Sequence, residues 1–227
     1  MNIAGMQKSS TIDYPGRLAA VLFAPGCDLS CFYCHNRPLI AGSAPLLPEE
    51  EVWGFLKKRQ GLLDGVVLSG GEPTLQRDLE AACRRLKDMG YGVKLDTNGQ
   101  HPERVKTLLK ANLIDYLAVD IKALPGDYPS VAGGGSFDAA LACLGAATDT
   151  NVPCEGRTTV YPGLGEDKLL VLAGLLPALP RWRLNAYRMP EHYLAQDERR
   201  VRTAALSELE LAALLGRLRP FQPGVMG

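Results

Sequence analysis

The sequence predicts an α/β protein whose strands form a partial (β/α)6 barrel, similar to a TIM barrel but open on one side. Runs rich in Val, Leu and Ile alternate with amphipathic stretches along the whole chain. This alternation is typical of parallel strands that are buried on both faces and joined by crossover helices. A complete eight-stranded barrel needs about 250 residues. The 227 residues of this chain, one long loop included, therefore leave room for about six βα units.

Each strand is predicted from a short apolar run, and each helix from an amphipathic stretch that follows it. The predicted strands are residues 19–24, 65–69, 92–96, 116–121, 154–161 and 182–187. The predicted helices are residues 48–59, 75–89, 103–111, 137–147, 166–176 and 206–218. The last two helices carry acidic residues in their first turns, where the helix dipole favours negative charge.

The chain is expected to form a single domain, residues 1–227, because the alternating pattern has no repeat, low-complexity tract or linker. The barrel core would span residues 17–190, approximately, and residues 191–227 would form a C-terminal helix and tail. A glycine run at residues 132–136 is interpreted as a flexible loop before a helix. Residues 223–227 are interpreted as a loose tail.

The composition limits the classes of function. Hydrophobic residues make up 46% of the chain and charged residues 22%, which is typical of a globular protein and not of a disordered one. The 25 Lys and Arg residues balance 25 Asp and Glu residues, so nothing attracts the chain generally to nucleic acid or membranes. The apolar run at residues 19–25 is too short for a signal peptide or a membrane span. We therefore expect a cytoplasmic protein that binds neither nucleic acid nor membranes.

Three of the six cysteines lie within eight residues, directly after the first predicted strand. Cys27, Cys31 and Cys34 have the spacing C-x3-C-x2-C. Structural zinc sites and ordinary ferredoxin clusters take four protein ligands. Three thiolates would leave one iron of a 4Fe-4S cluster open to a substrate or cofactor. A zinc site would need His35, which is poorly placed beside Cys34. The cysteines at positions 83, 143 and 154 are isolated and are predicted to be core residues.

The segment of residues 26–36, called here the cysteine loop, resembles that of the radical S-adenosylmethionine (SAM) enzymes. Those enzymes have the same cysteine spacing and an aromatic residue before the last cysteine, here Tyr33. Within that superfamily, Asp13-Tyr14-Pro15-Gly16, Gly26-Cys27 and Cys34-His35-Asn36 resemble the activating enzymes of glycyl radical proteins.

The likeness is greatest to the anaerobic ribonucleoside-triphosphate reductase activating proteins, and it extends from Gly5 to about Pro190. It implies a radical SAM barrel with one 4Fe-4S cluster on the three cysteines. It also implies that Tyr33 contributes to cofactor binding.

The second predicted strand is followed by Ser69-Gly70-Gly71-Glu72-Pro73-Thr74. Two glycines let the backbone approach a ligand closely, and a glutamate can accept hydrogen bonds from an ammonium group. By itself, this segment could equally be a tight strand-to-helix turn. The resemblance assigns Gly70, Gly71 and Glu72 to the G-G-E motif, which holds the amino group of SAM.

Charged residues also follow the third and fourth predicted strands, in Asp96-Thr97-Asn98-Gly99 and Asp120-Ile121-Lys122. Buried charges persist only when they are paired or coordinated, so Asp120 and Lys122 could simply form an ion pair. In the resembling pyruvate formate-lyase activators, the matching segments lie around SAM. The resemblance implies SAM contacts for Asp96 and Lys122, and a monovalent cation held by Asp96, Thr97 and Asp120.

Four further residues are assigned by the resemblance. Arg157 matches a strand-start arginine that faces SAM and substrate, although an arginine is usually exposed, and Tyr161 replaces a valine later in the same strand. Asp13 and His35 match positions near the glycine segment of the partner protein, with a turn aspartate and a packed loop histidine as the alternatives. Arg188 stands where many activators carry a histidine, and is assigned to substrate contact.

The resemblance implies a radical SAM activase that cleaves SAM reductively and abstracts hydrogen from a glycine of a partner enzyme. The implied partner is anaerobic ribonucleoside-triphosphate reductase, with flavodoxin or ferredoxin as the electron donor. Only residues 37–47 separate the cysteine loop from the next helix, too few for a ferredoxin-like insertion with further clusters. Two alternatives stay open: a small-molecule enzyme similar to 7-carboxy-7-deazaguanine synthase, and a noncatalytic iron-sulfur or zinc-binding module.

Overall fold

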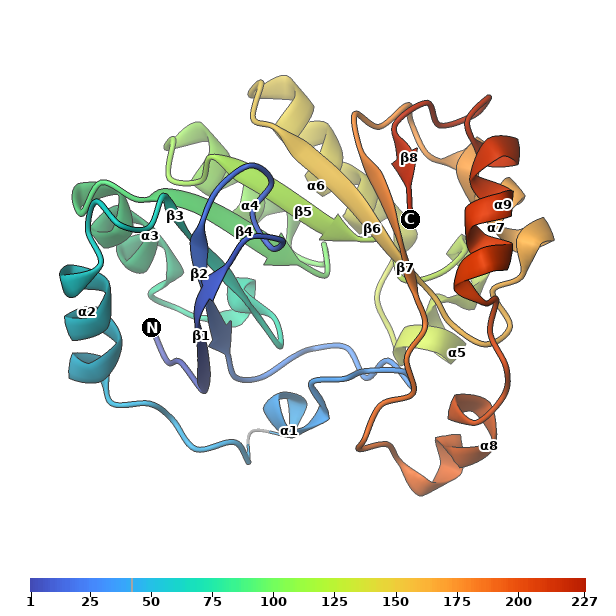
Figure 1. Ribbon diagram of the computed structural model, residues 1–227, viewed down its shortest axis with the longest axis horizontal. Helices are drawn as coiled ribbons and strands as arrows, with labels where there is room; N and C mark the ends of the chain where they lie inside the picture. Colours follow the sequence, from blue (N-terminus) through green and yellow to red (C-terminus); the bar gives the residue numbers. More distant parts are fainter. Residues whose placement is uncertain (42) are drawn as a thin grey trace.

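The computed structural model describes residues 1–41 and 43–227, and within them one sheet of eight strands follows the order of the chain (Figure 1). β1 is antiparallel to β2, and β2 to β8 are parallel. The strands are β1 (Gly5–Ser10), β2 (Ala19–Ala24), β3 (Gly65–Gly70), β4 (Gly92–Thr97), β5 (Tyr116–Asp120), β6 (Cys154–Val160), β7 (Trp182–Ala186) and β8 (Val225–Met226). All six predicted strands are present, with ends that differ by one residue at most. The α/β class and the run of parallel strands are confirmed.

The longer helices connect the strands and lie along the outside of the sheet (Figure 1). The helices are α1 (Arg37–Ile40), α2 (Glu49–Lys58), α3 (Leu79–Asp88), α4 (Pro102–Lys110), α5 (Tyr128–Ala132), α6 (Phe137–Asp149), α7 (Glu166–Leu175), α8 (Glu198–Val201) and α9 (Glu208–Leu218). The sequence did not predict α1, α5 and α8, because four or five residues are too few to show helical periodicity. No helix of the described chain is long and apolar enough to cross a bilayer.

Hydrogen bonds between side chains and the nearby backbone determine where two of the helices begin. α3 begins at Leu79, four residues later than predicted, because Pro73–Leu75 form a separate 3-10 turn capped by the Glu72 side chain. α9 begins after Ser207, whose hydroxyl accepts from the Glu210 N–H while the Glu210 carboxylate accepts from the Ser207 N–H. This reciprocal pair satisfies two backbone donors at the helix start.

The two faces of the sheet differ in chemistry. On β3, Val66 and Leu68 belong to the main core, which includes buried side chains from all the longer helices. Val67 belongs to a smaller cluster on the opposite face, together with Val21 and Tyr116. Since strand side chains alternate between faces, the inner face also receives the charged residues of β4, β5 and β6. The fold therefore directs charge to the inside of the barrel and apolar surface to the helices.

The sheet has two edges, β1 and β8, which the sequence did not predict. The interpretation of residues 223–227 as a loose tail is wrong, because β8 pairs with β7 and Val225 is buried. The buried Gln222 side chain helps to fix this segment, since it accepts from the Leu179 N–H at 3.0 Å and donates to the carbonyl oxygen of Ala173 at 3.0 Å.

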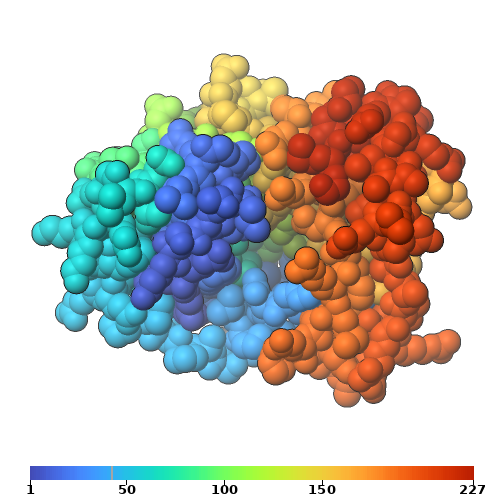
Figure 2. Space-filling view, viewed as in Figure 1, coloured from blue at the N-terminus to red at the C-terminus, as the bar shows by residue number. Residues whose placement is uncertain are grey.

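Figure 2 shows a hollow between the N-terminal strands, in blue, and the C-terminal segment, in orange and red.

Candidate active site

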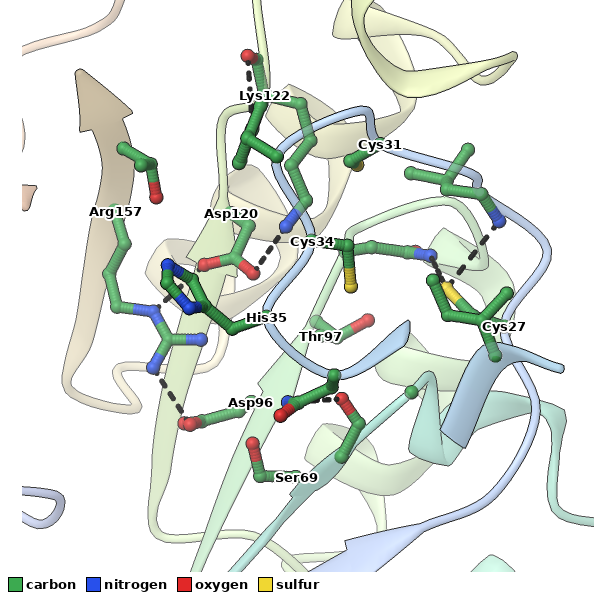
Figure 3. Close-up of a pocket in the computed structure, with 18 of the residues that line it drawn as sticks. Cys27, Cys31, Cys34, His35, Ser69, Asp96, Thr97, Asp120, Lys122 and Arg157 are labelled. Atoms are coloured by element: carbon green, nitrogen blue, oxygen red, sulfur yellow. Dashed lines mark hydrogen bonds and ion pairs between the residues drawn. The ribbon is translucent and has the colours of Figure 1, made fainter. Parts of the chain in front are cut away.

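A pocket of about 290 Å³ lies where the cysteine loop meets the carboxyl ends of the central strands (Figure 3). All the predicted site residues except Glu72 and Arg188 line it. The lining residues are Asp13, Cys27, Leu29, Cys31, Tyr33, Cys34, His35, Asn36, Ile40, Ser69, Gly70, Gly71, Asp96, Thr97, Asn98, Asp120, Lys122, Arg157 and Thr159. In a barrel of parallel strands this edge is where active sites form.

Hydrogen bonds fix the path of the cysteine loop. The N–H of Ser30 donates to the carbonyl oxygen of Ala132 at 2.7 Å, and the N–H of Phe32 donates to that of Val131 at 3.2 Å. Arg37, at the start of α1, donates to the Ser30 hydroxyl and to the carbonyl oxygen of Cys31, both at 3.0 Å. The loop is therefore tied to α5 on one side and to α1 on the other.

The glycine run at residues 132–136 packs against the cysteine loop. Gly133 has a φ of +72°, and a Cβ at this position would lie 3.1 Å from the Cβ of Ser30. Gly135 has a φ of +85°, and its Cβ would lie 2.9 Å from the Gln100 side chain. Because both positions combine positive φ with close neighbours, the run has a packing role that its interpretation as a flexible loop did not include.

The three thiols suit an iron-sulfur cluster. Across residues 1–41 and 43–227, no three His, Cys, Asp or Glu side chains converge closely enough to hold one metal ion. A zinc ion needs its ligands at about 2.0–2.3 Å from one centre, whereas the cysteines of an iron-sulfur cluster bind different irons. Cys27, Cys31 and Cys34 nevertheless line the same pocket. The donor set therefore fits a 4Fe-4S cluster.

The protonation of the thiols follows from their burial. Burial raises the pKa of the Cys27 thiol to about 12, and it also raises the pKa of the Cys31 thiol. The positive charge of Lys122 acts in the opposite direction on both, but it does not offset the burial. Both thiols are thus protonated at neutral pH in the metal-free protein. Because the thiolate is the metal ligand, loading with iron must release these protons.

Gly70 and Gly71 allow the turn after β3 to pack against the start of the cysteine loop. A Cβ on Gly70, whose φ is +119°, would lie 2.4 Å from the backbone N of Ala24. A Cβ on Gly71 would lie 2.0 Å from the carbonyl oxygen of Gly26. The sequence predicted that these glycines let the backbone approach a ligand. In the structure they also let the turn pack closely against the backbone that leads to Cys27. Both glycines still line the pocket.

Glu72 lies behind the pocket wall and is fully buried. One carboxylate oxygen accepts from the N–H of Thr74 at 2.9 Å, from the Thr74 hydroxyl at 2.6 Å and from the Thr97 hydroxyl at 2.8 Å. The other accepts from the N–H of Asn98 at 2.6 Å. Burial raises the pKa of the Glu72 carboxyl despite these bonds. In the structure the carboxylate joins the turns after β3 and β4. The contact of Glu72 with SAM stays a prediction.

Asn98 also lines the pocket, and the sequence alone predicted no role for it. Its Nδ2 donates to the Asp28 carboxylate at 2.7 Å and lies 3.8 Å from the Cys27 sulfur. His101 Nε2 lies 3.0 Å from the other carboxylate oxygen of Asp28. The turn after β4 is thereby attached to the cysteine loop as well as to Glu72. An Asn after an Asp-Thr pair at a strand end was the signal available in the sequence.

Arg157 lies between two carboxylates on neighbouring strands. Its Nη1 donates to Asp96 at 2.7 Å and its Nε donates to Asp120 at 2.9 Å (Figure 3). Lys122 Nζ donates to the second oxygen of Asp120 at 2.8 Å, so the predicted Asp120 and Lys122 pair is present. Burial alone would raise the pKa of both carboxyl groups, but Arg157 and the adjacent lysines lower it by more. Both aspartates are therefore ionised at neutral pH.

Lys94 extends this charged row toward the other end of the barrel. Its side chain is almost fully buried, and its Nζ donates to Asp96 at 2.7 Å and lies 3.6 Å from Glu155. The sequence gave a signal for it, since Lys94 and Asp96 are two residues apart on β4 and share its inner face. Asp96, Thr97 and Asp120, the predicted ligands of a monovalent cation, all line the pocket, and the cation itself stays a prediction.

The remaining predicted residues separate into two groups. Asp13 and His35 line the pocket, where the Asp13 carboxylate accepts from the Ser10 hydroxyl and His35 is exposed. Tyr33 also lines the pocket, and its hydroxyl donates to the carbonyl oxygen of Lys122 at 3.4 Å. Arg188 is not part of this site. It lines a separate cavity with Leu211 and other residues of β7 and α9.

A sequence model described as the radical SAM superfamily matches residues 21–176. The chain belongs to this superfamily. The match contains the whole cysteine loop and the ends of β2 to β6, which form the pocket described above. Membership identifies a radical SAM enzyme, whose cofactors are a 4Fe-4S cluster and SAM.

Curated relatives of this radical SAM protein include activating enzymes. It is 36% identical over 173 residues to a Methanocaldococcus jannaschii protein whose name assigns it to the glycyl-radical enzyme activating enzymes, covering 73% of this chain and 71% of that protein. It is 30% identical over 179 residues to the pyruvate formate-lyase-activating enzyme of Streptococcus mutans, covering 72% of this chain and 67% of that enzyme. The chain is therefore homologous to glycyl-radical enzyme activating enzymes.

The chain is also similar to radical SAM proteins that are not named as activating enzymes. The chain is 33% identical over 128 residues to the 7-carboxy-7-deazaguanine synthase of Thermococcus kodakarensis, a match that covers 47% of this chain and 50% of that enzyme. A radical SAM methyltransferase from Sphaerobacter thermophilus has a similar fold, with a TM-score of 0.70 at 16% identity over 94% of this chain and 66% of that one. At this identity the structural likeness concerns the fold alone.

Proposed function

We propose that this radical SAM protein is an activating enzyme that removes a hydrogen atom from a backbone glycine of a partner protein. The observation that carries the proposal is the 36% identity to the Methanocaldococcus jannaschii protein, which extends over 71% of that protein. The pocket supports it, because three thiols and a row of paired charges line the same space. We take residues 1–227 as one radical SAM domain.

The cluster ligands in this proposal are Cys27, Cys31 and Cys34. They line the pocket, whereas Cys83, Cys143 and Cys154 are buried in the core. When bound, the cluster and SAM supply the one-electron chemistry that removes a hydrogen atom from an unactivated C–H bond. The surrounding chain fixes the thiols through α1 and α5 and limits the access of water to Cys31, which is 6% exposed.

SAM would lie between the cysteine loop and the charged row. The Lys122 ammonium and the Arg157 guanidinium suit the carboxylate of SAM, and Asp96 suits its positively charged groups. The Gly70-Gly71 turn and Tyr33 supply the adjoining wall. Glu72 acts through Thr97 and Asn98 in this arrangement and positions the rim.

The substrate would reach the pocket through the hollow seen in Figure 2. Asp13 and His35 are suited to contact it, because both line the pocket and His35 is exposed. Glycine suits such a reaction since its missing side chain lets the backbone come close to the radical source. We propose anaerobic ribonucleoside-triphosphate reductase as the partner and flavodoxin or ferredoxin as the cytoplasmic electron donor.

A second candidate is a small-molecule radical SAM enzyme similar to 7-carboxy-7-deazaguanine synthase. The identity of 33% to the Thermococcus kodakarensis enzyme favours it, but that match covers only 47% of this chain. A small substrate would also favour a more enclosed pocket than one beside an open hollow. We rank it below the activating function for these two reasons.

The deciding experiment combines reduced, cluster-loaded protein with SAM and a candidate reductase in the absence of oxygen. An activating enzyme should generate a glycyl radical, visible by electron paramagnetic resonance as a doublet that collapses when the partner glycine is deuterated at Cα. The matched control is a reductase in which that glycine is replaced by alanine. Cleavage of SAM with turnover of a small metabolite, and no protein radical with any candidate partner, would favour the second candidate instead.

A further inference from the structure

A residue outside the superfamily match contacts the cysteine loop. The match ends at residue 176, and Arg200 lies on α8. The Arg200 guanidinium carbon is 3.9 Å from the centre of the Phe32 ring, and its Nη1 donates to the carbonyl oxygen of Ser130 at 2.8 Å. One side chain thus touches the cysteine loop and the α5 segment that supports the loop.

Phe32 lies between Cys31 and Cys34 and is 2% exposed. Its ring makes edge contacts with Tyr33 and Tyr161, at centroid distances of 5.2 Å and 5.5 Å. Its backbone N–H is the donor to Val131 of α5 described above. Displacement of Phe32 would therefore move the backbone that carries two of the three pocket thiols.

The helix that presents Arg200 is itself anchored. The Tyr187 hydroxyl, just after β7, donates to the carbonyl oxygen of Val201 at 2.7 Å, and Val201 is buried. Asp197 lies 3.7 Å from Arg200 Nη1, so a carboxylate also faces the guanidinium. The contact with Phe32 consequently belongs to a packed arrangement and not to a single long side chain on the surface.

We propose that Arg200 is a positioning residue for the cysteine loop. Its planar guanidinium packs on the Phe32 ring and donates to the backbone of α5. These two contacts hold the cysteine loop in the conformation in which Cys31 and Cys34 can bind the cluster. The inference rests on the proposed function for the identity of the cluster. The loop contact itself can be tested on the metal-free protein.

The test measures how fast iodoacetamide labels each cysteine of the metal-free protein, followed by peptide mass spectrometry. Arg200→Ala should increase the labelling rate of the buried Cys31 about tenfold, because the cysteine loop opens more often without the contacts that Arg200 makes with Phe32 and α5. Arg200→Lys should give an intermediate rate, since lysine keeps the charge but lacks the planar group. The matched control is Arg199→Ala, on the same helix at an exposed position. Cys83, which is 0% exposed, reports on the whole fold.

An unchanged Cys31 rate in Arg200→Ala would overturn the proposal. An equal acceleration at Cys83 would also overturn it, because Arg200 would then stabilise the whole fold and not the loop. In the reconstituted protein, Arg200→Ala should lose iron to a chelator about tenfold faster than Arg199→Ala, for the same reason. If labelling responds as expected but the wild-type protein binds no cluster, the proposed function fails while the role of Arg200 in the loop stands.

Discussion

The backbone N–H of Asn98 donates to the Glu72 carboxylate at 2.6 Å, across the ends of two neighbouring strands. Glu72 is fully buried, and Asn98 continues the connection to Asp28 and to the region of Cys27. Three chain segments that are distant in sequence are thus held in one arrangement at the pocket rim. The bonds of Glu72 therefore hold the rim together, although its carboxylate does not line the pocket.

Replacement of Glu72 by glutamine tests this connection. The amide keeps the size of the side chain but exchanges an acceptor for a donor, so at least one of the N–H groups of Thr74 and Asn98 would lose its partner. We expect a loss of about 1–3 kcal/mol in the free energy of unfolding, measured with urea on the metal-free protein. SAM binding should weaken through displacement of the rim. Glu50→Gln, at an exposed position of α2, is the control, and equal stability of the two variants would contradict the prediction.

The cluster assignment predicts iron content directly. Anaerobic reconstitution should give about four irons per chain, the content of one 4Fe-4S cluster. Cys27→Ala, Cys31→Ala and Cys34→Ala should each lose most of the iron and labile sulfide. Cys83→Ala should retain both, since Cys83 lies in the core away from the pocket. Full retention of iron in a variant lacking all three pocket cysteines would disprove the assignment.

Gly71→Ala tests the close packing of the turn against the cysteine loop. The added methyl group would lie 2.0 Å from the carbonyl oxygen of Gly26, so the backbone beside Cys27 must move. Overpacking of this kind costs about 1–3 kcal/mol, and iron binding should also weaken. Gly145→Ala, inside α6 with open space around it, should instead stabilise the protein by about 0.5–1 kcal/mol. Thermal or urea unfolding of both variants checks the contrast.

Arg157→Gln should change how stability depends on pH. The pKa values of Asp96 and Asp120 are lowered in the folded protein, with Arg157 as the largest lowering charge. A carboxyl with a lowered pKa stabilises the fold above its unfolded value, and this stability is lost as the pH falls through the folded value. The wild-type protein should therefore lose stability as the pH falls below about 4. Without Arg157, stability should be lower at pH 7 and should fall less steeply in acid.

Urea unfolding between pH 7 and pH 3 measures both curves. They should approach each other in acid, because protonated aspartates no longer distinguish the two proteins. Arg183→Gln provides the control, since Arg183 lies beside Arg157 in the register of β6 and β7 but outside the pocket. Parallel curves for the wild type and Arg157→Gln would show that the ion pairs do not control the acid response.

The sequence predicted the parallel strands well because their apolar runs are buried on both faces. It predicted the edges poorly, since β1 carries a polar Gln7-Lys8-Ser9 run and β8 has only two residues. The cysteine loop and most of the rim could be read from motifs at strand ends. Arg188 follows a strand end as the other site residues do, and only the fold shows that it lines a separate cavity with residues of α9.

Contacts between distant segments account for most of what the sequence did not reveal. Lys94 could have been inferred from its alternation with Asp96, but its partner Glu155 lies on another strand. The contact between Arg200 and Phe32 joins residues 168 positions apart, and no local pattern predicts it. The sequence predicted close approach at the glycines 70 and 71, but only the three-dimensional structure shows which backbone approaches them.

The two edges of the sheet have a consequence for self-association. An open barrel exposes strand edges, and long flat edges invite another chain to add a strand. Here one edge, β1, presents exposed Gln7, Lys8 and Ser9, and the other, β8, extends over two residues. Charged and very short edges discourage such pairing. The sheet therefore offers little template for aggregation along either of its edges.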